Sequence, residues 1–211
     1  MEMTVRDFQA ALASSSPTPG GGTAAAISLG QASALTIMVC DLTIGKDKWA
    51  EGWPIAEKAM LLAVKTMTRA GELADEDSDA FDEVMESFRL PKDTEQEKTS
   101  RRQAIRKATL VATEKPFETA KLALDLLEVL PELAAKGNGN AVSDVGVAGL
   151  LASAACKGAL FNVDLNLPGL PDDMAQEIRA NVPNIKDNAK ILSRKVCLLY
   201  TSPSPRDNTG S

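Results

Sequence analysis

The stretch SSSPTPGGGTAAAISLGQASALTIMVCDLTIGKDK, residues 14–48, decides the fold of this chain. No charged side chain occurs between Asp7 and Asp41, and the run of Ala, Ser, Ile, Leu and Gly is long enough for a central helix. Small residues on every side of a helix let neighbouring backbones come close, so we expect this helix to be buried. The stretch therefore predicts a glycine loop, a buried helix and a polar turn after the helix.

The same run approaches the roughly 20 apolar residues that a membrane span needs. Polar side chains interrupt it at Ser28, Gln31, Ser33 and Thr36, and positively charged flanks are absent. We therefore expect no membrane span here.

The loop before the helix contains both rigid and flexible backbone. Prolines at 17 and 19 restrict the backbone conformation, and Gly20, Gly21 and Gly22 after them permit conformations that other residues rarely adopt. The first turn of a helix leaves amide N–H groups unpaired and carries the positive end of the helix dipole. A carboxylate, phosphate or polar ring can dock at such a place. The alternative is a tight turn whose glycines only permit close packing, and the sequence leaves both open.

Composition sets limits on fold and function. A chain of 211 residues suits one domain, and 4% aromatics leave a core of Ala, Leu, Val, Ile and Met, which favours helices over sheet. The net charge of -6 argues against a nucleic-acid partner. A local basic group at residues 101–107 is expected to be a solvated helix face, with ligand binding as the alternative.

The chain contains no histidine, which excludes Ser-His-Asp and Cys-His catalysis and the usual zinc sites. Its three cysteines show no CxxC spacing, and no apolar signal segment opens the sequence. We therefore expect a cytoplasmic protein in which any proton transfer falls to Asp, Glu, Lys or water.

Further helices are predicted on both sides of the central one. A short helix over residues 5–14, capped by Thr4, is expected to lie against the central helix. A long helix is predicted from about Pro54 to Phe88, because apolar residues step by three or four along one stripe.

Asp77 is the one carboxylate on that stripe. Its place among Leu73, Phe81 and Val84 should turn it inward, where an unpaired carboxylate is costly. A partner, a ligand or a raised pKa should accompany it. We expect its neighbours Asp75, Glu76, Asp79 and Asp82 to form the solvated side.

A third long helix is predicted from about Thr94, with a kink or split at Pro116, and it ends at Gly137. Four polar residues then crowd into a turn and helix start: Asn138, Asn140, Ser143 and Asp144. Capping explains one or two of them, so we favour a polar site. A second uncharged, small-residue helix follows, and a last helix is predicted from about residue 171 to 196.

The sequence thus predicts an all-α helical bundle with two central small-residue helices. The domain is expected over residues 1–196, with residues 197–211 as a disordered or non-native tail.

Four segments in order, SSSPTPGGGTAAA, LTIGK, ADEDSDAF and GNGNAVSDVGVAGLLASAA, resemble the cyclodeaminase/cyclohydrolase family of folate enzymes. The resemblance implies a helical homodimer whose folate groove is lined by the glycine loop, the Thr-Ile-Gly-Lys turn and the Asn/Asp turn. It also implies no metal or redox cofactor. Family members often have Tyr where Trp49 stands, so no hydroxyl is available there.

The resemblance also implies roles for individual residues. Asp77, Asp144 and Lys46 are the expected catalytic residues, and Lys46 has an alternative role as binder of the substrate's glutamate carboxylate. The expected substrate-binding residues are Pro19, Gly20, Gly21, Gly22, Thr43, Gly45, Asn138, Asn140 and Ser143.

The reaction expected first is closure of formiminotetrahydrofolate to 5,10-methenyltetrahydrofolate with release of ammonia. The alternative is hydrolysis of methenyltetrahydrofolate to 10-formyltetrahydrofolate. A third possibility, from another class of protein, is a folate-binding or dimerising module without catalysis. A carboxylate suits either reaction, because it can stabilise a cationic one-carbon bridge and receive a proton from water.

Overall fold

The computed structural model describes residues 2–201 and shows helices and no strands within them, which confirms the all-α prediction. The helices are α1 (Val5–Leu12), α2 (Gly21–Thr43), α3 (Trp53–Arg89), α4 (Glu95–Lys136), α5 (Val142–Asn166) and α6 (Gln176–Thr201). Short 3₁₀ segments lie at η1 (Asp47–Gly52), η2 (Gly139–Ala141) and η3 (Leu167–Gly169).

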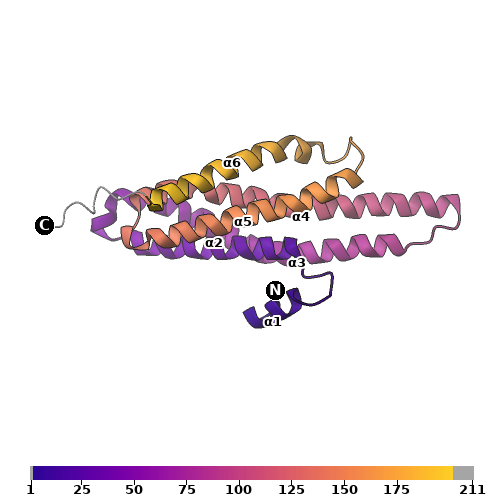
Figure 1. The fold of residues 1–211 in the computed structure, drawn as a ribbon, viewed down its shortest axis with the longest axis horizontal. Helices are drawn as coiled ribbons and strands as arrows, with labels where there is room; N and C mark the ends of the chain where they lie inside the picture. Colours follow the sequence, from indigo (N-terminus) through magenta and orange to yellow (C-terminus); the bar gives the residue numbers. More distant parts are fainter. Residues whose placement is uncertain (1, 202–211) are drawn as a thin grey trace.

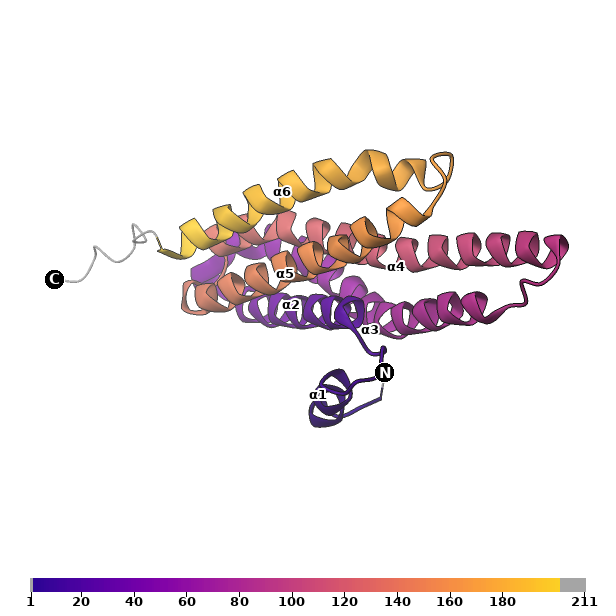
Figure 2. The same ribbon diagram turned by 45° about the vertical axis from the view of Figure 1, so that its right-hand side comes forward.

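The four helices α2 to α5 form an elongated up-and-down bundle, and α6 lies along α4 and α5 (Figure 1). Helix α2 packs between α3 and α5, while α4 closes the bundle on the other side. The far parts of α3 and α4 extend beyond the other helices as a two-helix arm, which Figure 2 shows from a second side.

The core consists of small and aliphatic side chains, as the composition predicts. Leu29, Ala32 and Val39 of α2 and Ala148, Ala152 and Ala155 of α5 are fully buried. Both helices are long and apolar enough to cross a membrane by length and composition alone, and half of each apolar window is buried inside the bundle.

Helix α1 does not lie against the central helix, which corrects that prediction. Thr4 caps it as expected, yet none of its residues is buried. Figures 1 and 2 both show it apart from the bundle, below the start of α2. Helices α3 and α5 already pack on the flanks of α2, so the interior of the bundle is complete without α1.

The apolar stripe of α3 packs on α2 only over part of its length. Ala70, Leu73 and Ala74 are buried, whereas Phe81 is 39% and Phe88 50% exposed. The reason is that α2 begins at Gly21, so the stripe has no helix over it along the arm.

Pro116 does not split α4, which runs as one helix through it. A proline inside a helix leaves the carbonyl four residues earlier without its backbone donor. Here the side-chain amide of Asn166, at the end of α5, donates to the Ala112 carbonyl at 2.9 Å. This contact satisfies the carbonyl that the proline leaves without a backbone donor.

The last helix, α6, continues to Thr201, five residues beyond the predicted domain end at 196. Val196 is still buried against Gly149 of α5, and apolar residues follow it. The rest of the predicted tail, residues 202–211, lies outside the described residues.

Candidate functional site

The predicted site residues fall into two groups at opposite ends of α2. We call the first group the loop end: it consists of the loop from Pro17 to Gly20, the first turn of α2, and Asp77 of α3. The loop contains a cis peptide bond between Thr18 and Pro19. Gly20 is the N-cap of α2 and offers no side chain to the first turn.

The Asp77 carboxylate from α3 takes the place of that missing cap. The Thr23 hydroxyl donates to Asp77 Oδ2 at 3.3 Å, and the Thr23 backbone also bonds to the carboxylate. The same hydroxyl lies 3.0 Å from that of Ser78. A Cβ at Gly22 would overlap with the carboxylate, so the close approach of the two helices depends on this glycine.

Asp77 is half-buried, and burial raises the pKa of its carboxyl, while the bonds from Thr23 lower it by less. Among the described residues no lysine or arginine pairs with it. The inward turn and the raised pKa predicted for Asp77 are thus confirmed, with Thr23 as its partner. The positive end of the α2 dipole stabilises the negative charge only in part.

The second group, the turn end, joins the exit of α2 to the connection between α4 and α5. Thr43 is buried, donates to the Val39 carbonyl at 2.7 Å and accepts the Asn138 backbone N–H at 3.0 Å. The Asn138 amide donates to the Leu42 carbonyl at 2.9 Å, and its oxygen accepts the Asn140 N–H at 2.9 Å. Thr43 and Asn138 therefore hold the two segments together.

The loop after α2 turns sharply at Gly45, whose φ of 73° lies in the left-handed region that favours glycine. Lys46 follows on the surface with an exposed side chain. Its carbonyl accepts the Trp49 N–H at 2.8 Å and the Trp53 indole N–H at 3.3 Å. Trp49 is buried and lies under Gly139, so it supports the turn end through its ring.

The remaining predicted residues of the turn end are accessible to a ligand. Asn140 and Ser143 are exposed, and Asp144 is half-buried in the first turn of α5. The polar turn is thus partly capping, through Asn138, and partly free surface.

One chain does not bring the two ends together. Helix α2 has 23 residues, which at 1.5 Å per residue separates them by about 34 Å. Catalytic groups must lie within hydrogen-bond reach of the same reacting atoms. Asp77 therefore cannot share a reaction centre with Lys46 or Asp144 of its own chain.

A hollow of about 290 Å³ lies beside the turn end. None of the predicted site residues lines it; its lining is Asp47, Lys48, Trp49, Ala50, Glu51 and Lys136.

No group of three or more Cys, Asp or Glu side chains in the described part of the chain is placed to hold a metal ion.

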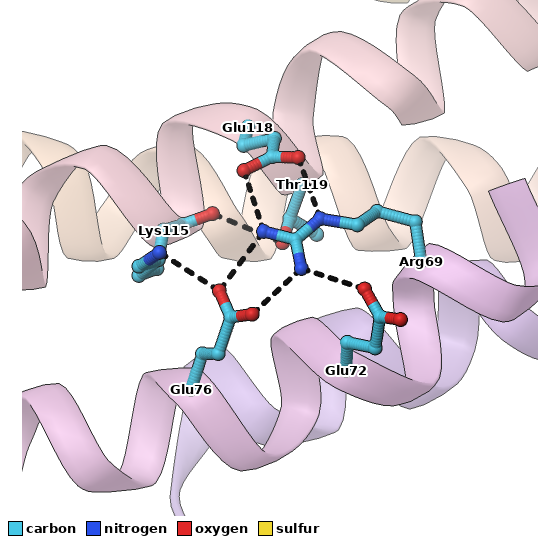
Figure 3. Close-up of polar contacts among 6 residues, drawn as sticks. All are labelled: Arg69, Glu72, Glu76, Lys115, Glu118 and Thr119. Carbon is cyan, nitrogen blue, oxygen red and sulfur yellow. Dashed lines mark hydrogen bonds and ion pairs between the residues drawn. The ribbon is translucent and has the colours of Figure 1, made fainter.

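The prediction that Glu76 lies on the solvated side of α3 is wrong. Glu76 belongs to an ionic cluster between α3 and α4 (Figure 3). Arg69, Glu72 and Glu76 of α3 meet Lys115 and Glu118 of α4 there. The sequence signal was present as charges at Arg69, Glu72 and Glu76, which share one helix face. The partners on α4 lie about 40 to 50 residues away along the chain, a separation over which helical periodicity carries no information.

Comparisons with known proteins match nearly the whole domain. A sequence model of the formiminotransferase-cyclodeaminase family matches residues 4–184. The chain is 43% identical over 180 residues to methenyltetrahydrofolate cyclohydrolase of Methylorubrum extorquens, covering 83% of this chain and 85% of that protein.

More distant matches extend the comparison. Mouse formimidoyltransferase-cyclodeaminase is 29% identical over 177 residues, covering 84% of this chain, which spans only about a third (33%) of that protein. The crystal structure of formiminotetrahydrofolate cyclodeaminase from Thermotoga maritima superposes with a TM-score of 0.79 at 25% identity, covering 94% of this chain and 96% of that one.

Proposed function

The chain belongs to the formiminotransferase-cyclodeaminase family, and we propose that it is a folate enzyme that hydrolyses 5,10-methenyltetrahydrofolate to 10-formyltetrahydrofolate. The 43% identity to a cyclohydrolase over most of both chains supports hydrolysis over the deaminase reaction, which is the first expectation from the motifs alone. Cyclodeaminase remains the second candidate, because the Thermotoga maritima protein of similar fold carries that name.

One observation carries the proposal: Asp77 is a half-buried carboxylate without a cationic partner among the described residues. A carboxylate in that state is suited to a cationic substrate, and the methenyl bridge between two nitrogens is cationic. A raised pKa makes Asp77 a stronger base, so it can accept the proton of the attacking water.

The reaction needs a proton donor as well as a base. Water adds to the bridging carbon and gives its proton to Asp77. One carbon–nitrogen bond then breaks, and the released nitrogen gains a proton from an acid such as the Lys46 ammonium. The hydroxyl left on the carbon becomes the formyl carbonyl by giving its proton to the resulting Lys46 amine, and the proton held by Asp77 passes to solvent, so that one proton is released overall. Asp144 is the second carboxylate able to stabilise the cation, and Lys46 has the competing role of binding the substrate's glutamate carboxylate.

These roles require two copies of the chain, since the loop end and the turn end of one copy lie about 34 Å apart. We propose a homodimer whose two-fold axis crosses the outer face of α2. The two α2 helices would then run antiparallel, and Asp77 would meet the turn end of the partner subunit. Each dimer would contain two composite sites.

The outer face of α2 suits such a contact, because its exposed and half-buried positions are almost uncharged. It carries Ile27, Gln31, Ala34, Met38 and Leu42. Apolar side chains flank it on both sides, with Val64 and Met67 of α3 and Val147 and Phe161 of α5 between 41% and 72% exposed. Exposed apolar surface of this extent marks interaction sites.

The loop end then contributes the Asp77 carboxylate and the exposed Gly21, with Pro19, Gly20 and Gly22 shaping the approach of the substrate. The turn end contributes Asn140 and Ser143, held in place by Thr43, Gly45 and Asn138. The proposed reaction uses water alone, and we propose no metal or redox cofactor, no nucleic-acid partner and a cytoplasmic location.

The full chain, purified and given each folate separately, tests the proposal. Consumption of methenyltetrahydrofolate above its spontaneous hydrolysis supports the cyclohydrolase. Ammonia release from formiminotetrahydrofolate, without that hydrolysis, would support the cyclodeaminase instead. Saturable binding of folate with turnover of neither would indicate a binding module.

A further inference from the structure

The ionic cluster of Arg69, Glu72, Glu76, Lys115 and Glu118 lies outside the proposed site and has no part in the reaction described above. Arg69 is its centre (Figure 3). Its guanidinium bonds to Glu118 at 2.7 and 3.0 Å, to Glu76 at 2.6 and 2.9 Å, and to Glu72 at 2.8 Å. These five bonds use all five N–H donors of the guanidinium.

The cluster fixes the orientation of α3 relative to α4 through contacts made by side chains of both helices. Glu118 reaches Arg69 from α4, and Lys115 of α4 reaches back to Glu76 of α3 at 2.8 Å. Bidentate pairs of arginine and carboxylate fix orientation as well as distance. A rotation of α3 about its axis would break several of these bonds at once.

Asp77 follows Glu76 directly, and successive residues on an α-helix point about 100° apart. Glu76 therefore meets α4, while Asp77 meets Thr23 of α2. The position of Asp77 tolerates little error, because it fits between the Gly22 backbone and the Thr23 hydroxyl.

At the level of Asp77, α3 packs mainly through small side chains. The α3 residues buried around Asp77 are mostly alanines, at positions 70, 74 and 80, with Leu73 as the one large side chain. Each alanine makes few atom contacts, so directional hydrogen bonds at this level add to what packing fixes.

From these contacts we propose that Arg69 is a positioning residue, which holds α3 at the rotation where Asp77 faces the start of α2. The consequence for turnover rests on the proposed function, whereas the consequence for the contact between Asp77 and Thr23 does not. Removing Arg69 alone leaves Glu72, Glu76 and Glu118 without their shared cation, which lowers stability as well, so the test needs a measurement at the contact between Asp77 and Thr23 itself.

The test compares Arg69→Met with Lys186→Met, which removes a two-bond ion pair between α6 and Asp164 of α5 and touches neither α3 nor the cluster. We expect Arg69→Met to lower kcat by tenfold or more while KM stays near wild type, as for a displaced catalytic group. Arg69→Lys keeps the positive charge but lacks the planar set of guanidinium donors, so its kcat should lie between those of wild type and Arg69→Met. Lys186→Met should leave kcat unchanged.

Two further measurements separate positioning from general damage. In an Asp77→Asn background, Arg69→Met should add little to the loss of kcat, because both changes act through one contact. Hydrogen exchange at the Thr23 amide should accelerate in Arg69→Met more than exchange at other α2 amides, and should not change in Lys186→Met.

The outcomes are distinct. Unchanged Thr23 exchange with wild-type kcat would overturn the positioning role, and so would equal acceleration at every α2 amide. If the wild-type chain turns over neither folate, the proposed function fails, and the Thr23 exchange comparison still decides the role of Arg69.

Discussion

Gly22 and the carboxylate of Asp77 occupy adjoining space so closely that a Cβ at position 22 would overlap with the carboxylate. Gly22→Ala should therefore displace Asp77 or α2, and lower the free energy of unfolding by about 1–3 kcal/mol, as overpacking does. Gly21→Ala is the matched control, because no atom lies within 4 Å of its Cβ. Urea unfolding of both variants should show loss of stability at position 22 only.

Asp77→Asn should reduce turnover by roughly two orders of magnitude or more, because the amide cannot accept the proton of water. It keeps the size of the side chain and an oxygen that can accept the Thr23 hydroxyl. Steady-state kinetics with unchanged circular dichroism is the measurement. Near-normal turnover would remove Asp77 from the site.

Stability should respond to pH in opposite ways at Asp77 and Glu76. Burial raises the pKa of Asp77, so folding favours its protonated form, and its contribution to stability is lost as pH rises through the folded pKa. Asp77→Asn removes that loss. Its melting temperature should therefore match wild type near pH 3 and exceed it near pH 7.

Glu76 behaves in the opposite sense, since hydrogen bonds from Arg69 lower its pKa to about 2. Its contribution is present above the ordinary pKa near 4.5 and is lost as pH falls toward 2. Glu76→Gln should cost about 1 kcal/mol at pH 7, a value reduced for the partial exposure of the side chain. Equal pH dependence of both variants would contradict the assignment.

The composite site predicts complementation between subunits. Asp77→Asn and Lys46→Ala proteins are each expected to be nearly inactive. Mixed by unfolding and refolding together, they should recover about a quarter of wild-type turnover, because half of the dimers are mixed and each mixed dimer has one intact site. No recovery in mixtures whose heterodimers are verified would contradict the shared site.

Gly21→Val should weaken folate binding more than folding, since Gly21 is exposed and a branched side chain would obstruct the ligand's approach. Isothermal titration with a non-reacting folate, set beside the melting temperature, measures both effects. Equal losses of affinity and stability would instead favour the tight-turn interpretation of the loop.

The sequence predicted the elements of this fold better than their contacts. The periodicity of α3 and the small residues of α2 are local features, so both helices and the inward turn of Asp77 were predictable. Long-range pairing is not predictable in this way: the contact of Glu76 with Lys115, and that of Arg69 with Glu118, depend on how α3 and α4 pack.

The same limit applies to the site. The motifs identified the loop end and the turn end, but the length of α2 keeps them apart, and a list of motif residues contains no distances. The position of α1 depended on which flanks of α2 were already occupied, which only the assembled bundle shows.

The bond from Asn166 to the Ala112 carbonyl has a consequence for how the chain reaches its native state. Pro116 denies α4 one of its own backbone bonds, and the replacement donor is 54 residues away at the far end of α5. The hydrogen bonding of α4 at Ala112 is therefore complete only when the end of α5 lies against it. A nascent chain that ends before Asn166 has no such donor for the Ala112 carbonyl, so the middle of its α4 lacks one hydrogen bond of the finished fold.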